Sequence, residues 1–165
     1  MSGNLSVKVN FDGREVEFSG DVEEVTSLLL QFLTKYYPSL SIISDLVLTI
    51  DLESLLKSVK GVLAISEGEI VILVPKEELS DREHVLLILL KAYLENKLGL
   101  RERVDVSIGE VASISGEPKS TISGRLSELV NEGLVKRVER GKYKITPLGV
   151  KELTEKIIPE VSSAG

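Results

Sequence analysis

Basic and hydroxyl-bearing side chains are concentrated in one stretch of the sequence, PKSTISGRLSELVNEGLVKRVERGKYKIT at residues 118–146. Lysine and arginine neutralise phosphate, arginine can also bond a guanine bidentately, and serine and threonine bond bases or phosphates. A glycine among them allows close approach of backbone to a ligand. These residue types favour binding of a nucleic acid. The candidate contacts are Lys119, Ser120, Thr121, Ser123, Gly124, Arg125, Lys136, Arg137, Arg140, Lys142 and Lys144.

Two elements are predicted to position these side chains, a helix over residues 118–131 and a hairpin, or wing, over 135–146. The buried face of the helix is indicated by apolar residues at helical spacing, Ile122, Leu126 and Leu129. Its opposite face then presents Ser120, Thr121, Gly124 and Glu128, with Arg125 at the edge. Because Glu128 would repel phosphate, contacts are expected in the first two turns of the helix.

Two further helices are predicted before this stretch. Ser107 and Glu110 have the spacing of a capping box, and the short helix that they open ends at Gly116. Ser80 and Glu83 open a longer helix over about 81–98, which Gly99 closes. The long helix carries an apolar stripe wide enough to contact both halves of the protein, so we expect the halves to pack together.

The first 77 residues predict an α+β unit. Asp12-Gly13 favours a two-residue hairpin turn in which Val9 opposes Val16 and Val7 opposes Phe18. Asp21 caps a following helix that Pro38 stops, and a second hairpin turns at Glu67-Gly68 before Pro75. Between them, residues 39–60 are compatible with helix or strand, with Asp51 as the cap of a short helix at their end.

Charge divides the chain in the same way. The 165 residues carry a formal charge of −6. In residues 1–77, six basic residues face twelve acidic ones, whereas in 118–151 eight basic residues face three acidic ones. An acidic half and a basic patch therefore coexist. The mean hydropathy of +0.14 is high for a chain of this size and indicates dense packing or an oligomer interface.

The run SIGEVASISGEPKSTISGRLSELVNEGLVKRVERGKYKITPLG resembles the winged helix-turn-helix of bacterial and archaeal regulators such as the MarR and ArsR types. The resemblance covers about residues 80–158 and nothing before them. It implies that helix 118–131 enters a DNA major groove while the wing follows the phosphate backbone or the minor groove. Ala112 is small where two helices would cross, Gly116 suits the tight turn, and TPLG starts a last helix containing Leu153, Ile157 and Ile158.

Each feature also has a plainer interpretation. Ser120, Thr121 and Ser123 could be solvated helix residues, and Arg125 could pair with Glu128 or Glu132 on the surface. The lysines of residues 136–144 could protect an exposed strand edge from aggregation. The clustering of all these features in one module favours DNA binding.

Catalysis and metal binding have little support in the sequence. Cysteine is absent, and the single histidine, His84, has no second histidine to share a metal, so it is expected at the surface. Asp45, Asp51 and Glu53 are most simply caps and solvated positions, and no glycine-rich loop fits a phosphate. We expect no cofactor and no enzyme activity.

No secretion signal or membrane span is evident, and the scarcity of thermolabile side chains suits a cytoplasmic protein from a hot environment. The expected fold is α+β, with a hairpin-plus-helix unit at 1–77 packed on a winged helix-turn-helix at 78–160, and a tail at 161–165. The leading functional prediction is a homodimeric, sequence-specific regulator of transcription that binds double-stranded DNA. Residues 1–77 would serve dimerisation or a protein partner. The alternative is a winged-helix adaptor in a transcription, replication or division complex.

Overall fold

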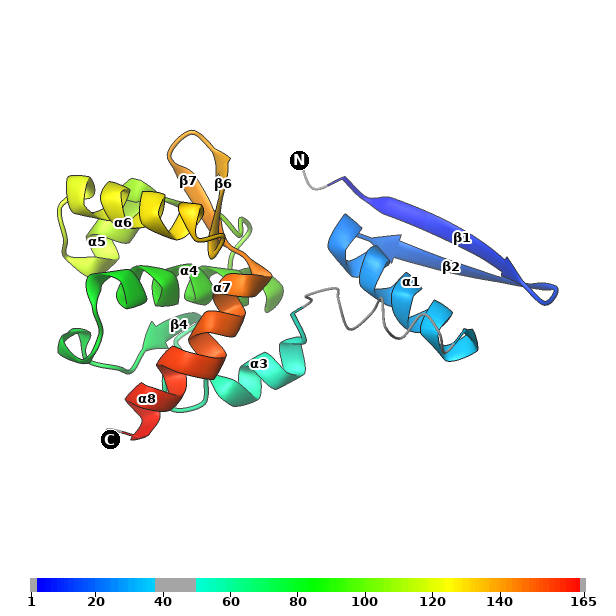
Figure 1. Ribbon diagram of the computed structural model, residues 1–165, viewed down its shortest axis with the longest axis horizontal. Helices are drawn as coiled ribbons and strands as arrows, with labels where there is room; N and C mark the ends of the chain where they lie inside the picture. The colour runs from blue at the N-terminus through cyan, green and yellow to red at the C-terminus, as the bar shows by residue number, and fades with distance from the viewer. Residues whose placement is uncertain (1–2, 38–49, 164–165) are drawn as a thin grey trace. The chain divides into compact units, whose positions relative to one another are not determined.

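The computed structural model describes residues 3–37 and 50–163 of the chain, which form two compact units, Met1–Thr49 and Ile50–Gly165 (Figure 1). We call them unit 1 and unit 2. Helices and small antiparallel sheets occur in both, so the expected α+β class is confirmed.

Unit 1 begins with the predicted hairpin, formed by β1 (Leu5–Phe11) and β2 (Arg14–Gly20). Asp12 and Gly13 adopt φ of +49° and +74°, as the two central positions of the turn require. Val9 faces Val16 and Val7 faces Phe18, so the register expected from the alternation of apolar residues is confirmed.

The helix α1 (Val22–Tyr36) follows, and the Asp21 carboxylate accepts a hydrogen bond from the Glu24 amide at 2.8 Å. Aromatic rings join helix and hairpin: the centroid of Phe11 lies 4.4 Å from Tyr36 and 6.0 Å from Phe32. Among the described residues of unit 1, Val25 alone is fully buried. Unit 1 is therefore held by one partly exposed aromatic cluster.

Unit 2 is built around α4 (Asp81–Lys97), which Ser80 and Glu83 open through the predicted capping box. Six consecutive apolar residues of this helix, 85–90, are at most 1% exposed. A helix that is apolar on every side belongs inside a core, and other elements pack around α4. Before it come α3 (Leu52–Ser58), β3 (Leu63–Ser66), β4 (Glu69–Ile72) and η2 (Lys76–Glu78).

The boundary between the units differs from the expected one at residue 77. Leu55 of α3 and Ile70 of β4 are buried in the same apolar core as α4. The carboxylate of Glu95 on α4 also accepts a hydrogen bond from the Ile70 amide at 3.0 Å. Because α3 and the second hairpin complete the core around α4, they belong to unit 2. The short helix capped by Asp51 is present, whereas the ambiguous residues 39–49 lie outside the described part.

The rest of unit 2 follows the order of a winged helix. Its sheet has the strand order β5-β7-β6. The pairing of β5 with β7 was not foreseen because β5 has only two residues. The elements are β5 (Val106–Ser107), α5 (Ile108–Ser115), α6 (Lys119–Asn131), β6 (Val135–Glu139), β7 (Lys142–Ile145), α7 (Pro147–Glu152), the π-helical η3 (Leu153–Ile157) and α8 (Ile158–Ser163).

Candidate nucleic-acid interface

The helix α6 is positioned by its inner face. Ile122, Leu126 and Leu129 are all 0% exposed and belong to the core around α4, so the predicted buried face is confirmed. Gly116, at φ +74°, closes α5 with a left-handed residue and turns the chain toward α6. The ion pair between Arg82 of α4 and Glu132 holds the other end of α6. The orientation of its outer face is therefore fixed by packing.

The outer face of α6 presents small polar residues to solvent. Lys119, Ser120 and Gly124 are exposed, and Thr121, Ser123 and Arg125 are partly exposed. A Cβ atom built on Gly124 would meet nothing within 4 Å, so this glycine leaves open space above the helix backbone. Lys119 lies over the first turn of α5, where its Nζ is 3.7 Å from the place that a Cβ on Gly109 would take.

Arg125 forms an ion pair within its own helix. Its guanidinium donates to both carboxylate oxygens of Glu128, at 3.0 and 3.1 Å. Of the two surface partners considered for Arg125, Glu128 is thus the one that the structure contains, while Glu132 binds Arg82. Arg125 remains partly exposed, so a stronger acceptor could compete with Glu128 for its donors.

The wing consists of β6 and β7 and lies beside α6 (Figure 1). Gly141, at φ +73°, allows the turn after Arg140, and the register shifts between Arg137 and Glu139. Lys136 stands directly opposite Lys144. Since their neighbours Val135 and Ile145 face the core, the two lysines extend from the outer face of the sheet.

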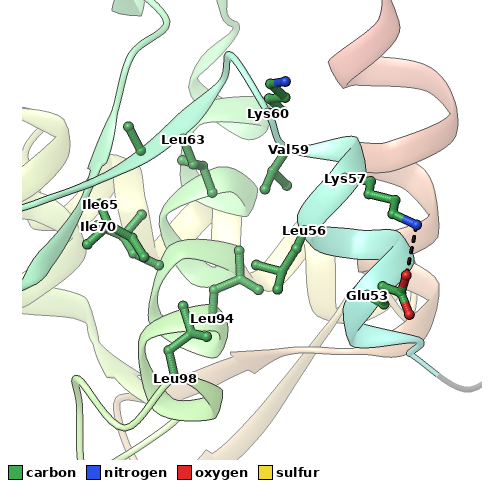
Figure 2. Close-up of a pocket in the computed structure, with 11 residues that line it drawn as sticks. Glu53, Leu56, Lys57, Val59, Lys60, Leu63, Ile65, Ile70, Leu94 and Leu98 are labelled. Carbon is green, nitrogen blue, oxygen red and sulfur yellow. Dashed lines mark hydrogen bonds and ion pairs between the residues drawn. The ribbon is translucent and has the colours of Figure 1, made fainter.

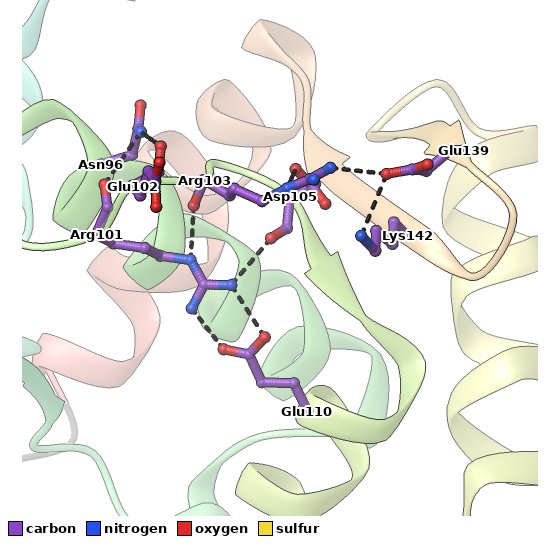
Figure 3. A network of polar contacts seen from close by, with 8 residues as sticks. All are labelled: Asn96, Arg101, Glu102, Arg103, Asp105, Glu110, Glu139 and Lys142. Atoms are coloured by element: carbon purple, nitrogen blue, oxygen red, sulfur yellow. Dashed lines mark hydrogen bonds and ion pairs between the residues drawn. The ribbon is translucent and has the colours of Figure 1, made fainter.

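The basic side chains of the wing fall into two groups. Lys136, Arg137 and Arg140 form no ion pair within residues 3–37 and 50–163. Lys142, in contrast, has its Nζ 3.2 Å from a Glu139 carboxylate oxygen, which also accepts a hydrogen bond from Arg103 at 2.7 Å (Figure 3). The hydrogen bonds from Lys142 and Arg103 hold the pKa of Glu139 below its ordinary value. Part of the wing's positive charge is therefore neutralised within the protein.

Arg103 belongs to a polar network that joins the loop after α4 to the wing and α5 (Figure 3). Its Nε donates to Asp105 at 3.0 Å. Nearby, Arg101 donates two hydrogen bonds to Glu110, at 2.5 and 2.9 Å, and a third to the Asp105 carbonyl at 2.9 Å. The hydrogen bond from Arg101 lowers the pKa of Glu110. The network fixes the base of the wing relative to α5.

Arg103 is a residue that sequence reasoning missed. The Arg103 side chain is more than half exposed, and its hydrogen bond to Glu139 connects it to the wing. Glu139 is 36 residues away in the chain. No local pattern marks such a pair, since its two members meet through the pairing of β5 with β7 and of β7 with β6.

His84 was expected at the surface, and that expectation is wrong. Its side chain lies within the apolar turns of α4, 7% exposed, and its Nδ1 atom has no hydrogen-bond partner in the described structure. Burial, with a contribution from the nearby Lys76, lowers the pKa of His84, so the imidazole is neutral at pH 7. It was misplaced because the apolar stripe seen in the sequence covered only one side of a helix that is buried all round.

Two other kinds of site, for metals and for membranes, have no support in the described residues. Among residues 3–37 and 50–163, no group of three histidine, cysteine, aspartate or glutamate side chains could hold a metal ion. None of the described helices has the length and apolar character needed to span a membrane.

Comparison with protein families supports the helix-turn-helix assignment. Residues 100–139, which run from the loop after α4 through α5 and α6 to the end of β6, match the IclR helix-turn-helix domain. The winged helix-turn-helix is thus supported, but the matching family is IclR and not the expected MarR or ArsR type. No curated protein and no solved structure matches the chain.

Proposed function

We propose that this protein is a regulator of transcription that binds double-stranded DNA in a sequence-specific manner. In this proposal α6 enters the major groove, and the wing of β6 and β7 contacts the phosphate backbone. The match of residues 100–139 to the IclR helix-turn-helix domain supports a regulator that binds DNA. The roles of the individual side chains rest on the geometry of unit 2.

The observation that carries the proposal is the placement of unpaired cations beside a small, neutral helix face. Lys136, Arg137 and Arg140 have no ion pair within the described residues. The exposed and partly exposed residues of α6 include Ser120 and Thr121 in its first turn, and the backbone is open at Gly124. A phosphate backbone satisfies the cations, and hydroxyl groups can donate to or accept from base edges.

The lysine pair across the wing supports the same role. Lys136 and Lys144 occupy directly opposite positions on β6 and β7. Like charges at such positions destabilise a sheet. A phosphate placed near Lys136 would offset part of this repulsion, which favours a binding role over a purely protective one.

A salt titration of DNA binding tests the proposal. The double variant Arg140→Ala with Lys142→Ala should bind a selected duplex more weakly, and the slope of log K against log salt should fall by roughly 0.9 for each phosphate that the variant no longer neutralises. The matched control is Lys57→Ala with Lys60→Ala, which removes the same charge from two exposed residues, one in α3 and one just after it. Binding that is insensitive to salt, or equal slopes in the two double variants, would refute the proposed role of the wing.

For unit 1 we propose a role in dimerisation or in binding a protein partner. Its described part buries only Val25 completely and leaves Tyr36 and Tyr37 about half exposed. Exposed aromatic residues are enriched in protein interfaces. Measuring the molecular mass in solution, for the native protein and for Tyr37→Ser, tests the dimer; a monomeric native protein would exclude it.

An adaptor function is favoured by one observation. Arg125 and Lys142, two of the candidate DNA contacts, are already bound to Glu128 and Glu139. In a protein adaptor such pairs would be ordinary surface structure. Recovery of one stoichiometric protein partner from native lysate, together with no retention on DNA at physiological salt, would select this alternative.

A further inference from the structure

Unit 2 contains an apolar pocket that the DNA-binding proposal does not use (Figure 2). The pocket lies between α3 and the β3–β4 hairpin, above the last turns of α4, and its volume is about 430 Å³. This size falls within the range of sites for small molecules. Its apolar lining consists of Leu56, Val59, Leu63, Ala64, Ile65, Ile70, Leu94 and Leu98.

The walls of the pocket are held in place by the surrounding structure. Glu95 is 5% exposed, and its Oε1 atom accepts hydrogen bonds from the Ile70 amide at 3.0 Å and from Lys91 Nζ at 2.7 Å. These bonds fix β4 against α4. On the other side, Leu55 and Val59 are buried in the core and anchor α3. The part of the pocket formed by β4, α4 and the buried residues of α3 is therefore preformed, which reduces the entropy lost when a ligand binds.

The chemistry of the lining restricts the ligand. All eight apolar residues are aliphatic, so neither an aromatic ring nor a side-chain hydrogen-bond donor is available inside the pocket. Charged groups lie only at the rim, where Lys57 pairs with Glu53 at 2.8 Å. Lys60 is exposed and forms no ion pair with any residue that the structure describes. In Figure 2 Lys60 and Leu98 lie at opposite ends of the pocket.

We propose that this pocket binds a small aliphatic molecule with one anionic head group, either a carboxylate or a phosphate monoester. The alkyl chain lies among Ile70, Leu94 and Leu98, and the head group stays near the solvent, close to Lys60. Burial of the chain supplies most of the affinity, while the net positive charge of the rim selects the sign of the head group. This site is independent of whether α6 and the wing bind DNA.

A homologous series of straight-chain carboxylates tests the pocket directly. We expect saturable binding of one ligand per chain, with affinity rising about fourfold for each added methylene until the pocket is filled. The full chain is titrated with hexanoate, octanoate and decanoate below the concentrations at which micelles form. Calorimetry gives the affinity, and NMR shifts of the leucine and isoleucine methyl groups give the location. Absence of saturable binding to folded protein would overturn the proposal.

Variants separate the pocket from general adsorption to apolar surface. Leu56→Asp places a charge at the pocket wall and should reduce decanoate affinity at least tenfold. The matched control Ile114→Asp changes a residue of similar exposure, 42% against 39%, on α5 and should leave the affinity unchanged. Ala64→Trp, which fills the pocket without a charge, provides a second test if Leu56→Asp does not fold. Equal binding by Ile114→Asp and a folded pocket variant would refute the site.

The head group is tested with ligands of equal chain length. Lys60→Glu should weaken decanoate by about three- to tenfold and leave decanol within about twofold, because only the anion interacts with this ammonium. Decanoate and decyl phosphate distinguish the two possible head groups, and the tighter ligand identifies the preferred one. If decyltrimethylammonium bound as tightly as either anion, the proposed selection for negative charge would be wrong.

Discussion

The helix α6 and the wing differ in how they carry polar side chains. In α6 the candidate contacts are mostly neutral, and its one arginine in the middle of the helix, Arg125, is bound to Glu128. The wing has three cations without an ion pair in the described structure, Lys136, Arg137 and Arg140. Neutral groups discriminate between bases, and unpaired cations attract any phosphate. We therefore expect selectivity from α6 and affinity from the wing.

The two elements also differ in how they are held. Three fully buried residues fix α6 against the core, whereas four consecutive residues of β6, an edge strand, are exposed. A helix locked by packing presents its groups in one orientation, which base recognition requires. Long exposed side chains on a strand can adjust to the backbone of any sequence. Substitutions in the two elements can test this division, from the largest expected effect to the smallest.

Stability should depend on the helix core far more than on the wing surface. Leu126→Ala is expected to lower the free energy of unfolding by about 2–5 kcal/mol, because it leaves a cavity beneath α6. Arg137→Ala, at an exposed position without an ion pair in the described structure, should change it by no more than about 0.5 kcal/mol. Chemical denaturation measures both. Similar losses in the two variants would contradict the difference in packing.

We expect Arg125 and Arg140 to differ in how much they contribute to discrimination between DNA sequences. Arg125→Ala is expected to reduce the affinity ratio between the preferred duplex and a scrambled one by about 5- to 150-fold, corresponding to about 1–3 kcal/mol. Arg140→Ala should weaken both duplexes by the same factor and leave the ratio unchanged. Competition titrations at constant salt measure the ratio. The opposite result would assign recognition to the wing.

Releasing the paired cations should increase affinity by a smaller factor. Glu139→Gln frees Lys142 and Arg103, and we expect about two- to fivefold tighter binding of every duplex with a steeper salt dependence. Glu128→Gln frees only Arg125, so its gain should depend on the sequence of the duplex. Glu155→Gln on η3, outside the interface, is the control for a change in net charge. A loss of affinity in both interface variants would show that the pairs position their cations.

Much of the fold could be predicted from local patterns in the sequence. The Val9–Val16 register and the buried residues Ile122, Leu126 and Leu129 were predictable because periods of two and 3.6 residues determine which side chains share a face. The caps at Asp21 and Ser80 were predictable because a short polar side chain bonds the amide three residues later.

The errors arose where distant residues meet. The pair Arg103–Glu139 and the strand β5 depend on pairing between segments far apart in the chain. The unit boundary was misplaced because α3 and β4 complete the core around α4. No local sequence pattern in residues 50–77 predicts this packing. His84 was assigned to the surface for the same reason, since burial on every side of α4 is set by its neighbours.

The smallest effect concerns the cost of placing two lysines opposite each other. Lys136→Thr should raise the free energy of unfolding by no more than about 0.5 kcal/mol, because the repulsion between Lys136 and Lys144 is removed. Arg137→Thr is the matched control, since it changes the next residue of the same strand, which lies opposite Tyr143, and carries the same gain in strand propensity. The difference between the two variants isolates the charge repulsion. If Lys136→Thr also binds DNA more weakly than Arg137→Thr does, the unfavourable lysine pair contributes to DNA binding. If stability rises while binding is unchanged, the pair does not contact phosphate, and the affinity of the wing must come from Arg137, Arg140 and Lys142.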